Sequence, residues 1–141
     1  MTSLPELHPQ LAEDCIELGQ LTLCRLLLVP DANYPWLILV PMRDSIREIH
    51  ELSEDEQQQL MRESSLISKM LVDDFNADKV NVAALGNVVP QLHIHHIARY
   101  HDDAAWPAPV WGFCEALAYQ ENELAEFIAK VKTKLAGNFQ N

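Results

Sequence analysis

The chain has 141 residues, and its 10 Lys and Arg against 21 Asp and Glu give a net charge of −11 at neutral pH. This length favours one domain, residues 1 to 141, with one hydrophobic core. The acidic surface repels DNA, RNA and anionic membranes, so we expect neither a nucleic acid polymer nor a membrane as partner. A small phosphate-bearing ligand is still compatible with this charge, because backbone N–H groups can hold it.

The cysteines and the N-terminal residues indicate the cell compartment. Cys15, Cys24 and Cys114 are widely spaced and form no C-x-x-C pair, which predicts neither a disulfide framework nor a zinc ribbon. The stretch "MTSLPELHPQL" lacks the basic flank and apolar run of a signal peptide, and "PWLILVPM" is too short to cross a membrane. We therefore expect a cytoplasmic protein.

Three apolar runs follow an irregular or briefly helical lead-in over residues 1 to 13. They are "DCIEL", "TLCRLLLV" and "YPWLILVPM", separated by the turn signals Gly19-Gln20 and "PDAN". This pattern predicts an antiparallel meander of three strands.

A long helix is predicted next. In "LSEDEQQQLM", Ser53 and Glu56 form a capping box, and the helix can run to about Phe75. Its apolar residues recur at helical spacing, which predicts that one face packs on a sheet.

Two further strands, "KVNVAAL" and "QLHIHHIARY", are predicted around the turn residues "GNVVP". After the proline-rich "HDDAAWPAPVWG", apolar positions in residues 119 to 136 predict a C-terminal helix. The fold class is therefore α+β, with a mostly antiparallel five-stranded sheet. Trp106 and Trp111 lie outside any periodic element, so they can bury against a second subunit, close the rim of a pocket, or pack within one chain.

The stretch "QLHIHHI" crowds three of the six histidines together. In a strand, Gln91, His93 and His95 share one face, and His96 lies on the other. We expect His96 to pack against the long helix or to hydrogen-bond at its end.

Three uses of the pair His93 and His95 compete. Two imidazoles can chelate a metal if a third ligand approaches, but Arg99 stands where a carboxylate would help. They can also be a structural pair satisfied by hydrogen bonds in the core. Third, one imidazole can attack phosphorus while the next stabilises the phosphate oxygens.

Residues 91 to 97 resemble the signature of the histidine triad (HIT) superfamily of nucleotide hydrolases and transferases, His-φ-His-φ-His-φ-φ with φ apolar. Gln91 stands at the first histidine, His93 at the second and His95 at the third. "GNVVP" is similar to the family's Gly-Gln-Ser/Thr-Val stretch, and Arg99 falls where many members carry arginine. The likeness spans about residues 14 to 112, and "AWPAPVWG" resembles a bacterial branch with Gln at the first position.

The resemblance implies a HIT-like fold, a homodimer and a small nucleotide substrate. His93 would attack the α-phosphorus of a phosphoramidate or dinucleoside polyphosphate and form a nucleotidyl-histidine intermediate, with its other ring nitrogen donating to a backbone carbonyl or similar acceptor. His95 would donate to a phosphate oxygen, and no metal or other cofactor is required. The implied nucleotide and phosphate contacts are Asn81, the backbone around Gly86, Asn87 and Val88, and, at a ribose hydroxyl, Asp31.

Three residues depart from the family's pattern. Gln91 cannot shuttle a proton near neutral pH. Val88 replaces a hydroxyl residue, and the anionic Asp44 stands where many members have a fourth histidine. Two rival functions therefore stay open. One is a nucleotide-binding module with little turnover, and the other is a metal-dependent enzyme that uses the H-x-H pair.

Overall fold

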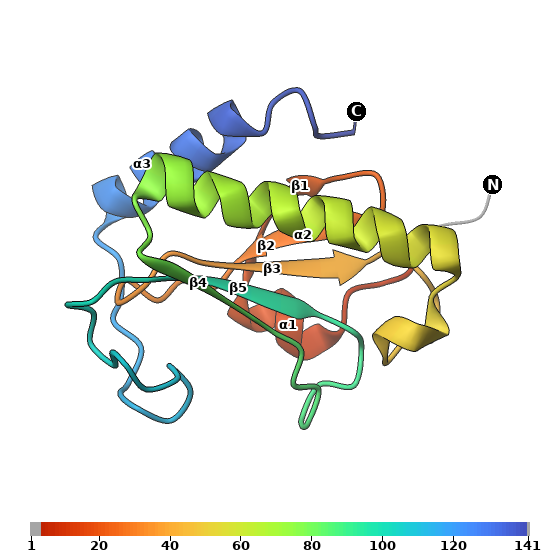
Figure 1. Cartoon of the computed structure of the whole chain (residues 1–141), viewed down its shortest axis with the longest axis horizontal. Coiled ribbons are helices and arrows are strands. Elements are labelled where there is room, and N and C mark those ends of the chain that lie inside the picture. The colour runs from red at the N-terminus through yellow and green to blue at the C-terminus, as the bar shows by residue number, and fades with distance from the viewer. Residues whose placement is uncertain (1–3, 141) are drawn as a thin grey trace.

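A computed structural model describes residues 4–140, and its centre is one antiparallel sheet of five strands (Figure 1). The strand order is β1-β2-β3-β5-β4. The bounds are Ile16–Gln20 for β1, Cys24–Leu28 for β2, Trp36–Pro41 for β3, Lys79–Ala83 for β4 and Ile94–Arg99 for β5. The α+β class and the five-stranded sheet predicted from the sequence are confirmed.

Helix α2, Glu54–Phe75, covers one face of the sheet (Figure 1). Ser53 accepts a hydrogen bond from the N–H of Glu56, whose carboxylate accepts from the N–H of Ser53, so the predicted capping box is present. Asn76 ends the helix in the left-handed conformation. The buried side chains of α2 join the core with the inner residues of β1, β2, β3 and β5. A short 3-10 helix, η1 (Ile49–Glu51), precedes α2.

Helix α3, Glu121–Lys134, falls within the predicted range 119 to 136, and Val131 anchors it in the same core. Figure 1 shows α3 beside the end of α2 rather than over the opposite face of the sheet.

The opposite face of the sheet carries a second, smaller core. Helix α1, Pro9–Asp14, buries Leu11 against this face. Ala105 and Val110, from the proline-rich segment after β5, pack there beside Trp36 and Ile97. The face with His95 is therefore partly covered by the N-terminal helix α1 and by the proline-rich segment after β5.

The predicted strand over residues 91 to 100 is shorter in the structure. Strand β5 begins at Ile94, so Gln91 and His93 lie just before it. Pairing with β3 stops at Leu39 and Ile94, and Pro90 has no N–H to extend a ladder. The expected alternation of side chains nevertheless continues, because Leu92 packs in the core under α2.

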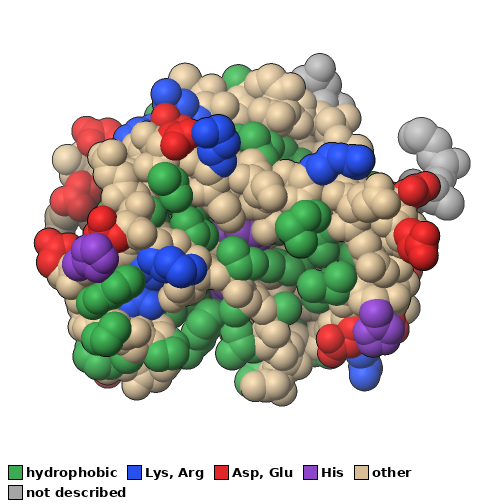
Figure 2. All heavy atoms as spheres, in the orientation of Figure 1, with side chains coloured by type: hydrophobic (Ala, Val, Ile, Leu, Met, Phe, Trp, Pro, Cys, Tyr) green, Lys and Arg blue, Asp and Glu red, His purple; other side chains and the backbone are tan. Residues whose placement is uncertain are grey.

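The molecular surface is apolar in the middle and acidic at the two sides of the face seen in Figure 2. Val82, Leu85 and Val88 are exposed on or after the edge strand β4. Within residues 4–140, no helix has the length and apolar character needed to cross a bilayer.

Candidate active site

His93 and His95 form an edge-to-face pair at the start of β5, with ring centroids 5.0 Å apart. Their side chains are mostly buried, with residue exposures of 7% and 8%. The strand geometry therefore brings the two predicted site histidines together on one face of the sheet.

The hydrogen bond of His93 fixes its tautomer. Its Nδ1 lies 2.8 Å from the backbone oxygen of Gln91. Because a carbonyl can only accept, Nδ1 must donate, and in the neutral ring Nε2 then carries the lone pair. The backbone acceptor that a nucleophilic His93 requires is thus present.

His95 has the opposite tautomer. The indole Nε1–H of Trp36 donates to its Nδ1 at 2.9 Å. Since an indole N–H can only donate, the single proton of neutral His95 lies on Nε2. Burial, followed by the neighbouring His93 and His96, lowers the pKa of His95 to about 4, so the ring is neutral at neutral pH.

Together the two rings offer a nucleophile beside a donor. Nε2 of His93 presents a lone pair, and Nε2 of His95 presents an N–H group. A phosphoryl group needs both, because attack places negative charge on its oxygens.

His96 points to the other face, as expected. Its Nε2 lies 2.7 Å from the hydroxyl of Ser64 on α2, and its Nδ1 donates to the backbone oxygen of Ile94 at 3.0 Å. The ring is fully buried, which lowers its pKa to about 4 despite the opposing effect of the Ile94 bond. His96 therefore holds α2 on the sheet.

Gln91 is occupied by the N-terminal segment, a contact that sequence reasoning missed. Its Oε1 accepts from the N–H of His8 at 2.7 Å, and its Nε2 donates to the oxygen of Glu6 at 3.1 Å. Both ends of the carboxamide are thus bonded to the backbone of residues 6 and 8. No sequence pattern pointed to this contact, which joins positions 83 and 85 residues apart.

The turn before the histidines is open to solvent. Gly86 has φ +70°, a left-handed conformation that favours glycine. Asn87 is exposed, and Val88 is 87% exposed. Gly86 and His93 line one small pocket together with Gln91, so this turn lies beside the proposed nucleophile.

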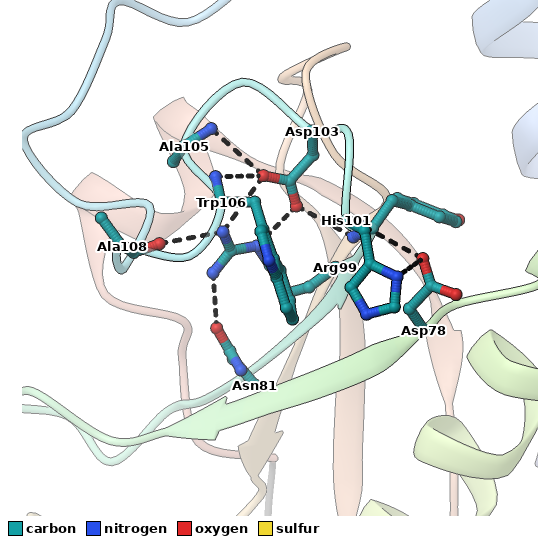
Figure 3. Close-up of polar contacts among 9 residues, drawn as sticks. Asp78, Asn81, Arg99, His101, Asp103, Ala105, Trp106 and Ala108 are labelled. Carbon is teal, nitrogen blue, oxygen red and sulfur yellow. Dashed lines mark hydrogen bonds and ion pairs between the residues drawn. The ribbon is translucent and has the colours of Figure 1, made fainter.

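Arg99 and Asn81 belong to a buried network shown in Figure 3. Arg99 donates from Nε and Nη2 to the carboxylate of Asp103 at 2.7 and 3.1 Å, and from Nη1 to Oδ1 of Asn81 at 2.7 Å. Burial opposes ionisation of Asp103, but bonds from Arg99 and from the N–H groups of Tyr100, Trp106 and Ala105 lower its pKa to about 2. The Oδ1 of Asn81 is therefore engaged by Arg99.

Asp31 anchors a turn to the segment that precedes α3. Its Oδ1 accepts from the backbone N–H groups of Asn33 and Leu117 at 3.0 and 3.2 Å and from the side chain of Asn33 at 2.8 Å. The N–H of Ala32 donates to the oxygen of Leu117. The bonded Oδ1 of Asp31 therefore holds the turn after β2 against the backbone of residue 117.

The two tryptophans of the proline-rich segment have different surroundings. Trp106 packs within the chain, with its ring 4.9 Å from that of His101 and 5.6 Å from the guanidinium of Arg99. Trp111 is 36% exposed and lies 5.2 Å from His95 and 5.8 Å from Trp36. Trp111 therefore lies against His95 and Trp36 with part of its side chain exposed.

The remaining sequence features have simple placements. Asp44 is exposed in the loop after β3. Within residues 4–140, His, Cys, Asp and Glu side chains form no group of three arranged for a metal ion. All three cysteines are free.

Residues 11–102 match the HIT domain family. The chain belongs to the HIT family. A histidine triad protein from Bradyrhizobium japonicum is similar to it at 47% identity, with a TM-score of 0.89 over 98% of this chain and 100% of that one. Another, from Marinobacter aquaeolei VT8, is 48% identical, with a TM-score of 0.91 over 96% and 99% of the two chains.

A more distant relative carries an enzyme name. The bis(5'-adenosyl)-triphosphatase of Saccharomyces cerevisiae strain YJM789 is 32% identical over 69 residues, which are 45% of this HIT protein and 34% of the yeast enzyme. The match thus spans about a third of the yeast enzyme's length.

Proposed function

We propose that this HIT protein is a nucleotide hydrolase or transferase that acts on the α-phosphate of a small nucleotide conjugate. The observation that carries the proposal is the pair of opposite tautomers, a lone pair on Nε2 of His93 beside a proton on Nε2 of His95. Such a pair matches the needs of nucleophilic attack on a phosphoryl group.

The reaction proceeds in two steps. Nε2 of His93 forms a bond to the α-phosphorus, the bond to the leaving group breaks, and its electron pair goes to the leaving oxygen or nitrogen. A leaving nitrogen takes a proton from solvent and departs as the neutral amine, whereas a leaving phosphate oxygen departs as the anion. Water then attacks the same phosphorus, gives up a proton to solvent, and breaks the bond between phosphorus and Nε2, so that a nucleoside monophosphate is released and His93 recovers its lone pair. His95 donates to a phosphate oxygen in both steps. Backbone groups at Gly86, Asn87 and Val88 add further donors.

The substrate class is a nucleotide phosphoramidate or a dinucleoside polyphosphate. The yeast relative's name supports the second type. In this proposal the amide Nδ2 of Asn81, whose Oδ1 is bonded to Arg99, contacts phosphate, and Asp31 accepts from a ribose hydroxyl. No metal or other cofactor enters the steps.

A nucleotide-binding module with little turnover is the second candidate. It is favoured by Gln91, whose carboxamide is bonded to the backbone of residues 6 and 8 and cannot transfer a proton. Incubation with a panel of adenosine and guanosine phosphoramidates, dinucleoside polyphosphates and nucleotidyl sugars separates the candidates. Release of nucleoside monophosphate supports the enzyme, and binding without release supports the module.

We propose in addition that the protein acts as a cytoplasmic homodimer. The edge strand β4 and the exposed Val82 and Leu85 beside it offer a surface for a second copy. Light scattering at micromolar concentration should give about twice the 16.0 kDa of one chain, and a monomer would end this proposal.

A further inference from the structure

A second pocket lies beside the site, on the Gln91 side of His93. Its volume is about 250 Å³, and its walls include His8, Ser45, Arg47 and Gln91. The proposed roles of His93 and His95 do not involve this pocket.

Two anchors hold the pocket in place. Gln91 binds the backbone of residues 6 and 8 through both ends of its carboxamide. The N–H of Leu92 donates to the oxygen of Ile46 at 2.9 Å, which fixes the loop carrying Arg47 next to His93. The first triad position therefore builds a pocket wall.

The pocket presents hydrogen-bond donors. Nδ1 of His8 accepts from the N–H of Gln10 at 3.1 Å, so the proton of the neutral ring lies on Nε2. Within residues 4–140, the guanidinium of Arg47 and the hydroxyl of Ser45 form no hydrogen bond or ion pair. Ser45 has φ +57°, a disfavoured conformation of the kind that clusters at ligand sites.

Nearby carboxylates are partly engaged elsewhere. Oε1 of Glu51 accepts from the N–H groups of Arg47 and Glu48 at 3.0 and 2.9 Å, and the Glu48 side chain accepts from the backbone of Glu51. The exposed Glu6 is the opposing charge in the pocket wall.

The position of the pocket indicates which part of a substrate would reach it. Arg47 and Gln91 line both this pocket and the small pocket at His93. Trp36 and Trp111 contact His95 and line neither of these two pockets. A substrate whose α-phosphorus lies at His93 can therefore extend in two directions, and one of them leads to Arg47.

We propose that this pocket binds an anionic, phosphate-bearing leaving group, with Arg47 as its main contact and His8 and Ser45 as further donors. The inference rests on the proposed function, because it assigns the leaving group of the same reaction. It favours dinucleoside polyphosphates, whose leaving group is a nucleotide, over phosphoramidates, whose leaving group is an amine. Arginine suits this role because its planar N–H groups match phosphate oxygens.

The test compares two substrates with the same base, the one selected by the substrate panel. One is a dinucleoside tetraphosphate, and the other is the nucleoside 5'-phosphoramidate. The measured quantity is the ratio of kcat/KM for the tetraphosphate to kcat/KM for the phosphoramidate. Arg47→Ala should lower this ratio by about 10- to 100-fold, the effect of one lost bond to a charged group. Arg47→Lys should lower it less, and Glu6→Gln should raise it.

Arg62→Ala is the matched control, because it removes the same charge from an exposed position on α2. It should leave the ratio unchanged. If Arg47→Ala changes the ratio no more than Arg62→Ala does, the proposed subsite is wrong, while the proposed function stands.

Calorimetric titration with inorganic tripolyphosphate gives a readout that needs no turnover. Arg47→Ala should weaken this binding about tenfold or more. If the wild type hydrolyses neither substrate, the proposed function fails, and the subsite is then judged on this affinity alone. Equal affinity in wild type and Arg47→Ala would overturn it.

Discussion

The indole N–H of Trp36 donates to Nδ1 of His95, and this one bond places the proton of the neutral His95 ring on Nε2. Trp36 is at the start of β3, and its register partner on β5 is Ile97, two residues from His95. Diagonal neighbours at this spacing reach each other when one side chain is large. We therefore expect Trp36 to act as a positioning residue, through His95, in the proposed reaction.

Replacing Trp36 with Phe should lower kcat by about 10- to 100-fold, or roughly 1.4 to 2.8 kcal/mol of barrier, because His95 loses the bond that keeps its proton on Nε2. Substrate KM should change little. Trp111→Phe is the control, since it keeps a ring beside His95 and leaves the Trp36 bond intact. Nitrogen NMR of the His95 ring reports the tautomer directly. An unchanged tautomer and kcat in Trp36→Phe would refute the positioning role.

Changing Gln91 to His restores the full triad pattern but removes both bonds to the N-terminal segment. We expect turnover within about tenfold of wild type, or roughly 1.4 kcal/mol, because the first position orients groups and does not attack. Faster hydrogen exchange at residues 6 to 10 should accompany the change. Gln91→Glu keeps the acceptor for the N–H of His8 but loses the donor to the oxygen of Glu6. It should therefore give a smaller increase in the hydrogen-exchange rate at residues 6 to 10. A larger loss of turnover would mean that the anchored segment is needed for the reaction itself.

Acid should destabilise the protein between about pH 6.5 and 4. Burial lowers the pKa of both His95 and His96 to about 4, whereas the unfolded chain binds these protons near pH 6.5. The unfolded state then holds more protons across this window, so the free energy of unfolding falls as the pH falls. Each ring contributes up to about 3 kcal/mol.

Urea unfolding at several pH values checks this expectation. His96→Asn should reduce the pH dependence between 6.5 and 4 by about half, since one of two similar groups is removed. Asp103 is not expected to contribute to the pH dependence between 6.5 and 4. Its pKa of about 2 means that the stability it provides is lost only in more acidic solutions. A wild-type stability that is flat over the window would contradict the burial argument.

Local signals predicted most of the helices and strands, because these elements depend on neighbouring residues. The turn signal Gly19-Gln20 was wrong, since both residues lie within β1 and pair with β2. The capping box of Ser53 and Glu56 marked the start of α2, and it is present in the structure. The start of β5 was placed too early, since the hydrogen-bonded pairing of β5 with β3 begins only at Ile94, opposite Leu39. The Trp36 bond joins positions 59 residues apart, and the Gln91 bond to His8 joins positions 83 apart. Such contacts depend on strand register and on the path of the N-terminal segment, which no local pattern contains.

Chelators should leave activity unchanged, because the proposed nucleophile is an imidazole and the proposed donors are protein groups. Turnover is measured before and after treatment with EDTA, followed by addition of Zn²⁺ or Mn²⁺. Loss of turnover with recovery on adding metal would favour the metal-dependent enzyme that the H-x-H pair left open. Metal analysis of the purified protein supplies an independent check.

Changing His93 to Asn should abolish turnover while nucleotide binding persists. Asparagine keeps approximate size and a hydrogen-bonding group near the oxygen of Gln91, but it has no ring nitrogen to attack phosphorus. We expect turnover to fall by several orders of magnitude under single-turnover conditions, with little change in the free energy of unfolding. His96→Asn is the control for turnover, because His96 lies on the other face of the sheet and should not form a bond to the nucleotide.

The covalent step is tested by stopping the reaction without acid, because the bond between phosphorus and the histidine nitrogen is sensitive to acid. The peptides are then analysed by mass spectrometry. A nucleotidyl group should be found on His93 in the wild type and be absent from His93→Asn. His95 should stay unlabelled, since its Nδ1 accepts the Trp36 bond and its Nε2 carries the proton in the neutral ring. A label on His95, or near-normal turnover in His93→Asn, would mean that the two imidazoles exchange roles and that the alignment of "QLHIHHI" to the triad must be redrawn.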